Sequence, residues 1–304
     1  MKKSFDQVKR MIESGSGDTK AVFTDDAAIA LFGVGKNMVV SMRHWSLAAG
    51  ILRFEENDGS RQGQLVISPL GYALLDNSGD PYLEHSASLW MIHWHLATIP
   101  GRTTTWYWAF NEFNEPVMDR DFLTERLLRR IKALRESGRM KESRITEITV
   151  KRDVECFVRT YLAKSPSARG SHEDNLESPL CELGLMHSID VGSAFSFCRG
   201  PKPTLPDEVF LFGLHDFWAR IYPTRRELTV ETVTHEPGSP GRVFMLDEES
   251  VADRLAVLAD LTKGAIRWDE STGMRQVYAH DLSSVNPLEM VSDLIRRSMN
   301  LRTA

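Results

Sequence analysis

The sequence predicts an α-rich α+β fold in which two or three winged helix-turn-helix-like units surround a helical middle. Two observations support this prediction. Amphipathic helical patterns dominate the 304 residues, and a helix followed by a β-hairpin recurs three times without repetition of sequence. Hydrophobic residues make up 42% and charged residues 26% of the chain. These values are ordinary for a globular protein and exclude a disordered chain, a collagen-like repeat and a disulfide scaffold.

The first unit is predicted within residues 1–79. Thr24 is a suitable N-cap for a helix that Gly33 ends, and a second helix follows whose apolar residues recur with helical spacing. Residues 51–54 and 64–67 then flank the turn-forming sequence NDGS, which is typical of a β-hairpin. Helix, turn, helix and hairpin in this order predict a winged helix-turn-helix.

The second unit is predicted within residues 80–220. Residues 80–115 are rich in Trp, Tyr and Phe, which indicates the core of a helical hairpin. A basic amphipathic helix follows at 122–134. The next helix, at 149–162, turns one apolar face inward, and residues 194–198 form a strand. The residues of that inward face are Val150, Val154, Phe157 and Tyr161.

The third unit is predicted within residues 221–304. Asp247 caps a helix that carries Val251 and Leu255 on its apolar face. Residues 265–268 and 275–279 form the last hairpin.

Charge is distributed unevenly along the chain. Residues 126–152 contain ten Lys or Arg against three Glu, a local balance of +7, so the rest of a chain of net charge −5 carries −12. The negative total argues against a general polyanion binder. The basic segment, by contrast, indicates a local nucleic-acid surface.

Candidate DNA-binding residues follow from this charge and from the winged-helix prediction. A recognition helix presents its outward residues to a groove, and flanking Lys and Arg contact phosphates. The alternative, that these charges are solvated faces of a protein–protein adaptor, stays open. The candidates are Lys36, Asn37, Arg43 and His44 in the first unit, Arg144, Thr149, Lys151, Arg152 and Arg159 in the second, and Arg199 and Lys202 in a Pro/Gly-rich loop that resembles a wing tip.

No pattern commits the chain to catalysis. The sequence GVGKN at 33–37 is not a phosphate loop, because Ala30 stands where the first glycine belongs and Asn37 follows the lysine. His93 and His95 point to different faces of a helix, so they are not expected to bind a metal. Neither G-x-S-x-G nor H-E-x-x-H occurs. We therefore expect no catalytic residue, no cofactor and no metal.

The three cysteines are too few and too scattered for a disulfide framework, which fits a reducing compartment. Cys156 is predicted to lie outward between Arg152 and Arg159, where positive charge lowers a thiol pKa. A sulfur-accepting role for Cys156 is the weakest alternative, since a small tolerated side chain explains this residue better. There is no membrane-length apolar run and no secretory signal, so we expect a cytoplasmic protein that does not bind membranes.

Six strings of residues carry a family resemblance: GVGKNM at 33–38, DPYLE at 80–84, VKRDV at 150–154, RGPKP at 199–203, LPDE at 205–208 and EPGSPGRVF at 236–244. As a set they resemble the bacterial family known as domain of unknown function 4007, over about residues 23–278. Members of that family are typically encoded beside proteins similar to phosphoadenosine-phosphosulfate reductases, in loci that look like phage defence or DNA phosphorothioation. The family has no established catalytic residues that the resemblance could assign to this sequence.

Together these observations predict a non-catalytic DNA-binding or DNA-targeting subunit of a bacterial phosphorothioation-linked DNA-modification or phage-defence system. Its expected partners are double-stranded DNA and a second protein. Two alternatives remain: an adaptor for a phosphoadenosine-phosphosulfate-reductase-like sulfur-transfer enzyme without DNA contact, and a winged-helix transcriptional regulator. Burial of the basic stretch, or its pairing with acidic neighbours, favours the adaptor.

Overall fold

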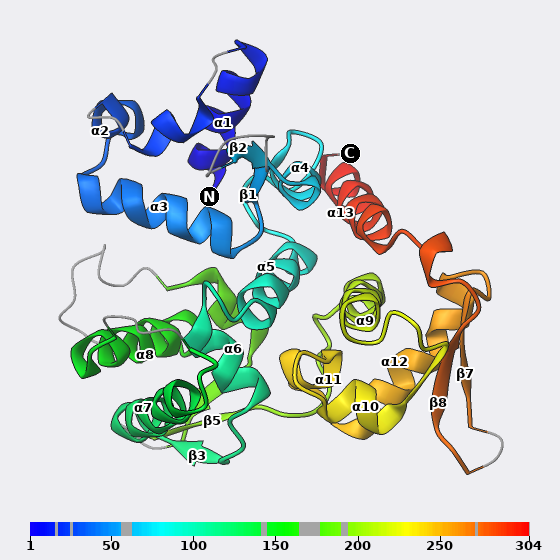
Figure 1. Ribbon diagram of the computed structural model, residues 1–304. Coiled ribbons are helices and arrows are strands. Elements are labelled where there is room, and N and C mark those ends of the chain that lie inside the picture. Colours follow the sequence, from blue (N-terminus) through cyan, green and yellow to red (C-terminus); the bar gives the residue numbers. More distant parts are fainter. Residues whose placement is uncertain are drawn as a thin grey trace. The chain divides into compact units, whose positions relative to one another are not determined.

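The computed structural model describes residues 1–15, 18–24, 27–55, 63–140, 145–163, 177–189, 194–270 and 273–303. The chain forms two compact units, one of residues 1–96 with 285–304 and the other of residues 97–284. Helices dominate both, and the strands form three small sheets (Figure 1), so the predicted α-rich α+β class is confirmed. In the part of the chain that the structure describes, no helix combines the length and the apolar character that a membrane span requires.

The first compact unit combines the N-terminal helices with the last helix of the chain. The strands β1 and β2 pair antiparallel, from Leu52 opposite Ile67 to Glu55 opposite Gln64. The Ser68 hydroxyl caps α4 by accepting a hydrogen bond from the Gly71 amide. The elements are α1 (Lys2–Glu13), η1 (Thr19–Phe23), α2 (Ala27–Phe32), α3 (Lys36–Ala48), β1 (Leu52–Glu55), β2 (Gln64–Ile67), α4 (Pro69–Leu75), most of α5 (Ser86–Thr98) and α13 (Pro287–Thr303).

Thr24 does not cap the helix that follows; it ends η1, and its hydroxyl donates to the carbonyl oxygen of Lys20. The predicted turn at 57–60 lies outside the described residues.

The end of α3 requires a glycine, because Gly50 has a φ of +72° and a Cβ there would meet the His95 ring.

The second compact unit begins with an aromatic core. Phe157 is fully buried, and its ring centroid lies 5.7 Å from those of Trp106 and Phe110. The strands form a sheet of order β3-β5-β4, in which both pairs are antiparallel. This part of the unit contains α6 (Thr104–Asn111), β3 (Val117–Met118), α7 (Arg120–Glu136), α8 (Glu147–Tyr161), η2 (Pro179–Leu183), β4 (Met186–Ser188) and β5 (Phe195–Phe197).

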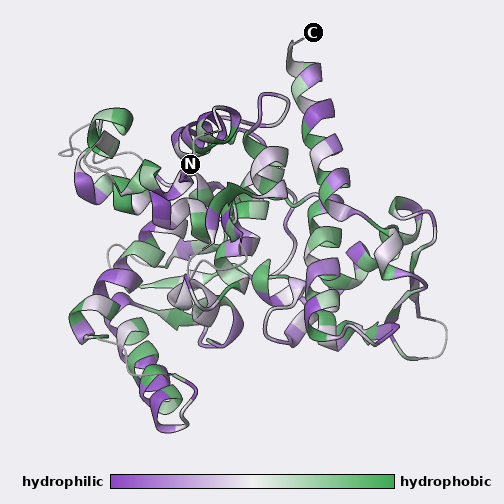
Figure 2. Ribbon diagram, turned by 45° about the horizontal axis from the view of Figure 1, so that its top comes forward, coloured by the Kyte–Doolittle hydropathy of each residue, from purple (hydrophilic) through white to green (hydrophobic). Residues whose placement is uncertain are grey.

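The rest of this unit repeats the pattern. Asp247 caps α12 as predicted, because its carboxylate accepts from the Ser250 amide at 2.9 Å. The sheet order is β6-β8-β7. The elements are α9 (Asp207–Ile221), β6 (Glu227–Thr229), α10 (Val230–His235), α11 (Pro240–Val243), α12 (Glu248–Leu261), β7 (Ile266–Asp269), β8 (Gln276–Ala279) and η3 (Leu282–Ser284). Hydrophobic and hydrophilic residues alternate along the helices, as expected for helices that bury one face (Figure 2).

One order of elements therefore occurs twice in this unit: helix, strand, helices, then a hairpin whose second strand pairs with the first strand. We call α6, β3, α7, α8, β4 and β5 the middle set, and α9, β6, α10, α11, α12, β7 and β8 the C-terminal set. The N-terminal set, from α1 to β2, has the same order with η1 in place of the first strand, since the Leu65 amide of β2 donates to the Thr19 hydroxyl at 3.0 Å. The two compact units do not coincide with the segments 1–79, 80–220 and 221–304, which stay predictions.

Candidate nucleic-acid interface

Helix α8 is anchored by one apolar face. The Thr146 hydroxyl caps the helix by accepting from the Thr149 amide at 3.2 Å. Val150, Val154, Phe157 and Tyr161 are buried, as the sequence predicts. Because this face is fixed in the aromatic core, the opposite face must point outward. It carries three predicted DNA-binding cations.

Those three cations differ in their contacts. The Lys151 ammonium lies 3.0 Å from the Asp121 carboxylate, and this hydrogen bond raises the pKa of Lys151. The Arg159 guanidinium lies 2.7 Å from Glu155. Within the described residues, Arg152 is exposed and forms neither a hydrogen bond nor an ion pair. Exposed ion pairs are weak because water screens them, so a phosphate group can displace such carboxylates.

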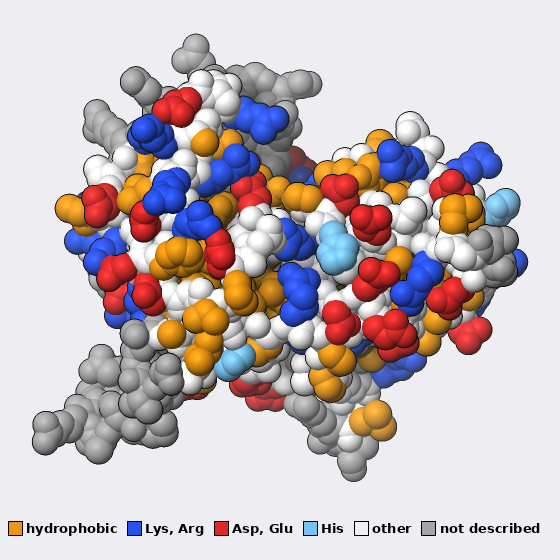
Figure 3. Space-filling model, turned by 90° about the horizontal axis from the view of Figure 1, so that it is seen from below, with side chains coloured by type: hydrophobic (Ala, Val, Ile, Leu, Met, Phe, Trp, Pro, Cys, Tyr) orange, Lys and Arg blue, Asp and Glu red, His pale blue; other side chains and the backbone are white. Residues whose placement is uncertain are grey.

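The predicted basic segment 126–152 is less positive in the folded protein than its sequence indicates. Of the eight cations of this segment that the structure describes, five form ion pairs: Arg126 with Glu115, Arg129 with Glu125, Arg130 with Glu112, Lys132 with Glu136 and Lys151 with Asp121. Four of these acidic partners precede residue 126, so the local charge balance of +7 counted over residues 126–152 does not include them. On the face seen in Figure 3, Lys and Arg side chains are interspersed with Asp and Glu. Arg144 lies outside the described residues.

In the N-terminal set, α3 presents the other predicted group. Lys36 and Asn37 are exposed in its first turn, after the N-cap Gly35. His44 is exposed, with its ring edge-on to Trp45. The Arg43 guanidinium lies over the Phe54 ring of β1, 5.8 Å from its centroid. These four residues therefore lie on or beside the outward face of one helix.

The predicted wing-tip loop is held by tertiary contacts. Lys202 is only 6% exposed, and its ammonium donates to the carbonyl oxygens of Cys198, Gly200 and Met245 at 2.8, 3.0 and 3.2 Å. Burial lowers its pKa to about 8. The Arg199 guanidinium donates to the Leu246 carbonyl oxygen at 2.9 Å. The loop thus joins β5 to α9 and is held against the segment before α12, so in this structure Lys202 is unavailable to a phosphate.

The cysteine and histidine expectations have separate outcomes. Cys156 is an exposed residue, as predicted, but partial desolvation of its thiol and the nearby Asp153 raise the thiol pKa rather than lower it. His93 is buried, and His95 is hydrogen-bonded to the Met91 carbonyl oxygen at 3.0 Å. Among the described residues, no three His, Cys, Asp or Glu side chains form a group that could hold a metal ion.

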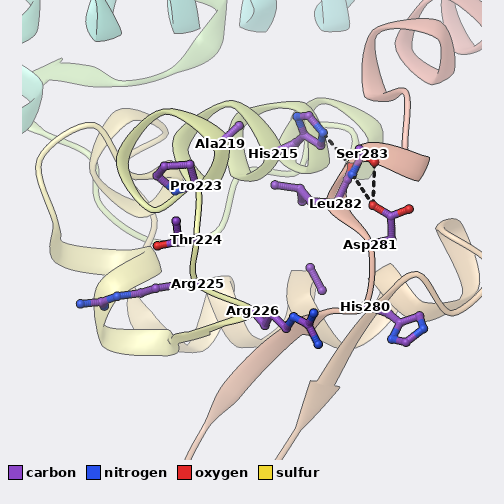
Figure 4. Close-up of a pocket in the computed structure, with 11 residues that line it drawn as sticks. His215, Ala219, Pro223, Thr224, Arg225, Arg226, His280, Asp281, Leu282 and Ser283 are labelled. Carbon is purple, nitrogen blue, oxygen red and sulfur yellow. Dashed lines mark hydrogen bonds between the residues drawn. The ribbon is translucent and has the colours of Figure 1, made fainter.

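The structure also has features that the sequence did not predict. A hollow of about 430 Å³ lies between α9 and the segment 279–283 (Figure 4), with Arg226 beside it. In it, His215 Nε2 lies 3.0 Å from the Leu282 carbonyl oxygen. On the middle sheet, His187 Nδ1 lies 3.0 Å from Cys198 Sγ. The first feature joins residues 67 positions apart, which no local pattern shows, and the second depends on the pairing of β4 with β5.

Comparisons with known proteins agree with this architecture. Two solved structures, described as "Magnesium ion-bound SspB crystal structure" and "SspB crystal structure", are similar to this chain with TM-scores of 0.76 and 0.75. Both are 28% identical to it, over 97% of this chain and 84% of theirs. No curated protein matches the sequence. A family model described as "Protein of unknown function (DUF4007)" matches residues 1–294. The chain therefore belongs to the DUF4007 family.

Proposed function

We propose that this protein is a non-catalytic DNA-binding subunit built from winged-helix units, and that α8 and α3 are its DNA-contacting helices. The recurring element order supports the proposal. In the sheets β3-β5-β4 and β6-β8-β7, the first strand pairs with the second strand of a later hairpin. In a winged helix, the helix just before the hairpin enters the major groove. Helices α3 and α8 hold that position in their sets.

The charged face of α8 is the observation that carries the proposal. Lys151, Arg152 and Arg159 are exposed on the side opposite the buried core face. Cations at this spacing suit phosphates on the two edges of a groove. On α3, Lys36 and Asn37 lie in the first turn, where the helix dipole favours an anion and an Asn side chain can read an adenine edge.

The corresponding helix of the C-terminal set, α12, is acidic, whereas on α8 three exposed acids balance the three cations. Glu249, Asp253 and Asp260 are exposed on α12, and such a face repels DNA. We therefore assign the C-terminal set to the protein partner.

The test is fluorescence anisotropy of the full chain with a short DNA duplex over a range of salt concentrations. The proposal expects binding at low salt with a steep linear fall of log K against log salt concentration, because Lys and Arg release counterions from the phosphates. Absence of binding at low salt overturns it.

A protein–protein adaptor without DNA contact is the second candidate. The ion pairs of the segment 126–152 favour it, since they neutralise much of the predicted basic surface. The link to DNA phosphorothioation or phage defence, with a phosphoadenosine-phosphosulfate-reductase-like partner, is supported by the family resemblance alone. One similar SspB structure holds magnesium, but our proposal uses no metal, because the described residues here gather no such cluster.

A further inference from the structure

Three cations lie where the loop 199–203 meets the segment 241–247: Arg199 is exposed, Arg242 is half-buried and Lys202 is buried. The Gly200 amide and the Lys202 ammonium both donate to the Met245 carbonyl oxygen, at 2.9 and 3.2 Å, and Arg199 donates to Leu246. The strings RGPKP, LPDE and EPGSPGRVF all contribute to this place. The proposal that α8 and α3 contact DNA gives these three strings no role.

Arg242 is the least satisfied member of this group. Its Nε is buried, and no described residue accepts a hydrogen bond from it. Burial lowers the pKa of Arg242. Burial also lowers the pKa of Arg199, and the positive charge of Arg242 lowers it further. The geometry agrees with this proximity, because Arg199 donates to the Leu246 carbonyl oxygen, and the Leu246 and Met245 amides donate to the carbonyl oxygens of Gly241 and Arg242.

The carboxylates of the region do not balance this charge. Asp207 is paired with Arg254 at 2.8 Å, so these two charges cancel. Asp247 influences Arg199 and Lys202 from a distance, while its carboxylate caps α12. Within the described residues, three cations (Arg199, Lys202 and Arg242) therefore face one carboxylate. Uncompensated charge at a partly buried site is costly unless an anion completes it.

We propose that Arg199 and Arg242 form a phosphate-binding site. Guanidinium groups bind phosphate oxygens through paired, charge-assisted hydrogen bonds, and Arg242 has donors to spare. Lys202 is a positioning residue, because its three carbonyl contacts fix the loop that carries Arg199. The phosphate belongs either to a small molecule or to a nucleic-acid backbone. The site lies outside α8 and α3 and does not depend on their binding DNA.

Thermal unfolding of the full chain tests the site, with inorganic phosphate compared against chloride at equal ionic strength. A bound anion stabilises the folded state and raises Tm. Arg242→Met keeps the alkyl stem and removes the charge. It should leave Tm in chloride unchanged or higher, and it should weaken phosphate binding about tenfold or more. Arg226→Met, which removes an exposed arginine of the same compact unit, should keep the phosphate effect.

A second arm identifies the source of the phosphate. If Arg242→Met weakens duplex DNA binding while free phosphate has no effect on Tm, the site holds a backbone phosphate. If Arg242→Met changes only the effect of inorganic phosphate on Tm, the ligand is a small molecule. Arg152→Glu with Arg159→Glu should leave the phosphate effect intact, which separates this site from the α8 proposal. If Arg242→Met alters neither measurement, or lowers Tm as a purely structural arginine would, the site is disproved.

Discussion

The Lys202 ammonium donates a hydrogen bond of 3.2 Å to the carbonyl oxygen of Met245, 43 residues later in the chain. Together with the carbonyls of Cys198 and Gly200, this contact gives a buried positive charge three backbone acceptors. Lys202 forms no ion pair with any residue that the structure describes. Its charge therefore makes the joint between the middle and C-terminal sets sensitive to pH.

Stability should rise with pH above pH 8 because of Lys202. Burial lowers its pKa to about 8 from an ordinary 10.5, so between these values the unfolded chain binds the proton more tightly than the folded chain. The stabilisation is complete above the unfolded pKa and is lost as pH falls through the folded pKa, a change of about 3 kcal/mol. Urea unfolding of wild type and Lys202→Met across this range measures it. The free energy of unfolding of wild type should rise relative to that of Lys202→Met as pH rises. A difference that stays constant with pH excludes Lys202 as the cause.

Arg152→Glu with Arg159→Glu should weaken binding to duplex DNA by about tenfold or more. The salt slope should become shallower by about 2, because two phosphate contacts are lost. Anisotropy titrations measure both quantities, and circular dichroism verifies folding. Arg296→Glu with Arg297→Glu on the exposed side of α13 makes the same charge change and should leave affinity unaltered. Equal losses in the two double variants would show a general charge effect rather than a role of α8.

Removing the acidic partners on and beside α8 should have the opposite effect. Asp121→Asn with Glu155→Gln frees Lys151 and Arg159, so DNA affinity should increase and the salt slope should steepen. The matched control, Glu249→Gln with Asp253→Asn on α12, changes net charge equally and should increase affinity less. If α8 is instead a face of an adaptor, the two variants will not differ.

Phe157→Ala should destabilise the second compact unit by about 3–5 kcal/mol, because it leaves a cavity in the aromatic core. Phe157 is fully buried, and its ring lies 5.6 Å from that of Tyr161. Urea unfolding measures the loss. Ile148→Ala, at an exposed position of the same helix, should have little effect on stability. A small loss for Phe157→Ala would mean that the core collapses around the cavity.

Cys156 should react slowly with iodoacetamide at neutral pH. Burial of the thiol and the nearby Asp153 raise its pKa, so little thiolate forms. Mass spectrometry of the alkylated chain gives the rate at this position, and the same thiol in the urea-unfolded chain is the reference. A folded rate above the unfolded one would support the sulfur-accepting alternative.

The local features of the fold could be predicted because their causes lie close together in sequence. The inward face of α8 follows from the spacing of Val150, Val154 and Phe157, and all three are buried. The cap at Asp247 and the hairpin of β7 and β8 were equally local. Each depends on residues a few positions apart, which a sequence pattern contains directly.

The electrostatic environment of the candidate sites could not be predicted in the same way. Lys151 pairs with Asp121, 30 positions earlier, and Lys202 with Met245, 43 positions later. The Pro/Gly content of the loop 199–203 predicted an exposed tip, whereas tertiary contacts bury Gly200 and Lys202 within it. The pKa of Cys156 was predicted from the sign of neighbouring charges without the desolvation that dominates it. Such effects depend on which distant segments meet.

The contact between α13 and α4 sets an order in which the two compact units can be completed during synthesis. Val291 and Ile295 of α13 are buried, and α13 packs on α4, which lies more than two hundred residues earlier. The ribosome delivers residues 97–284 before α13, so the second unit can fold while the first still lacks a helix. Until α13 arrives, the apolar surface of α4 that it covers stays open to chaperones.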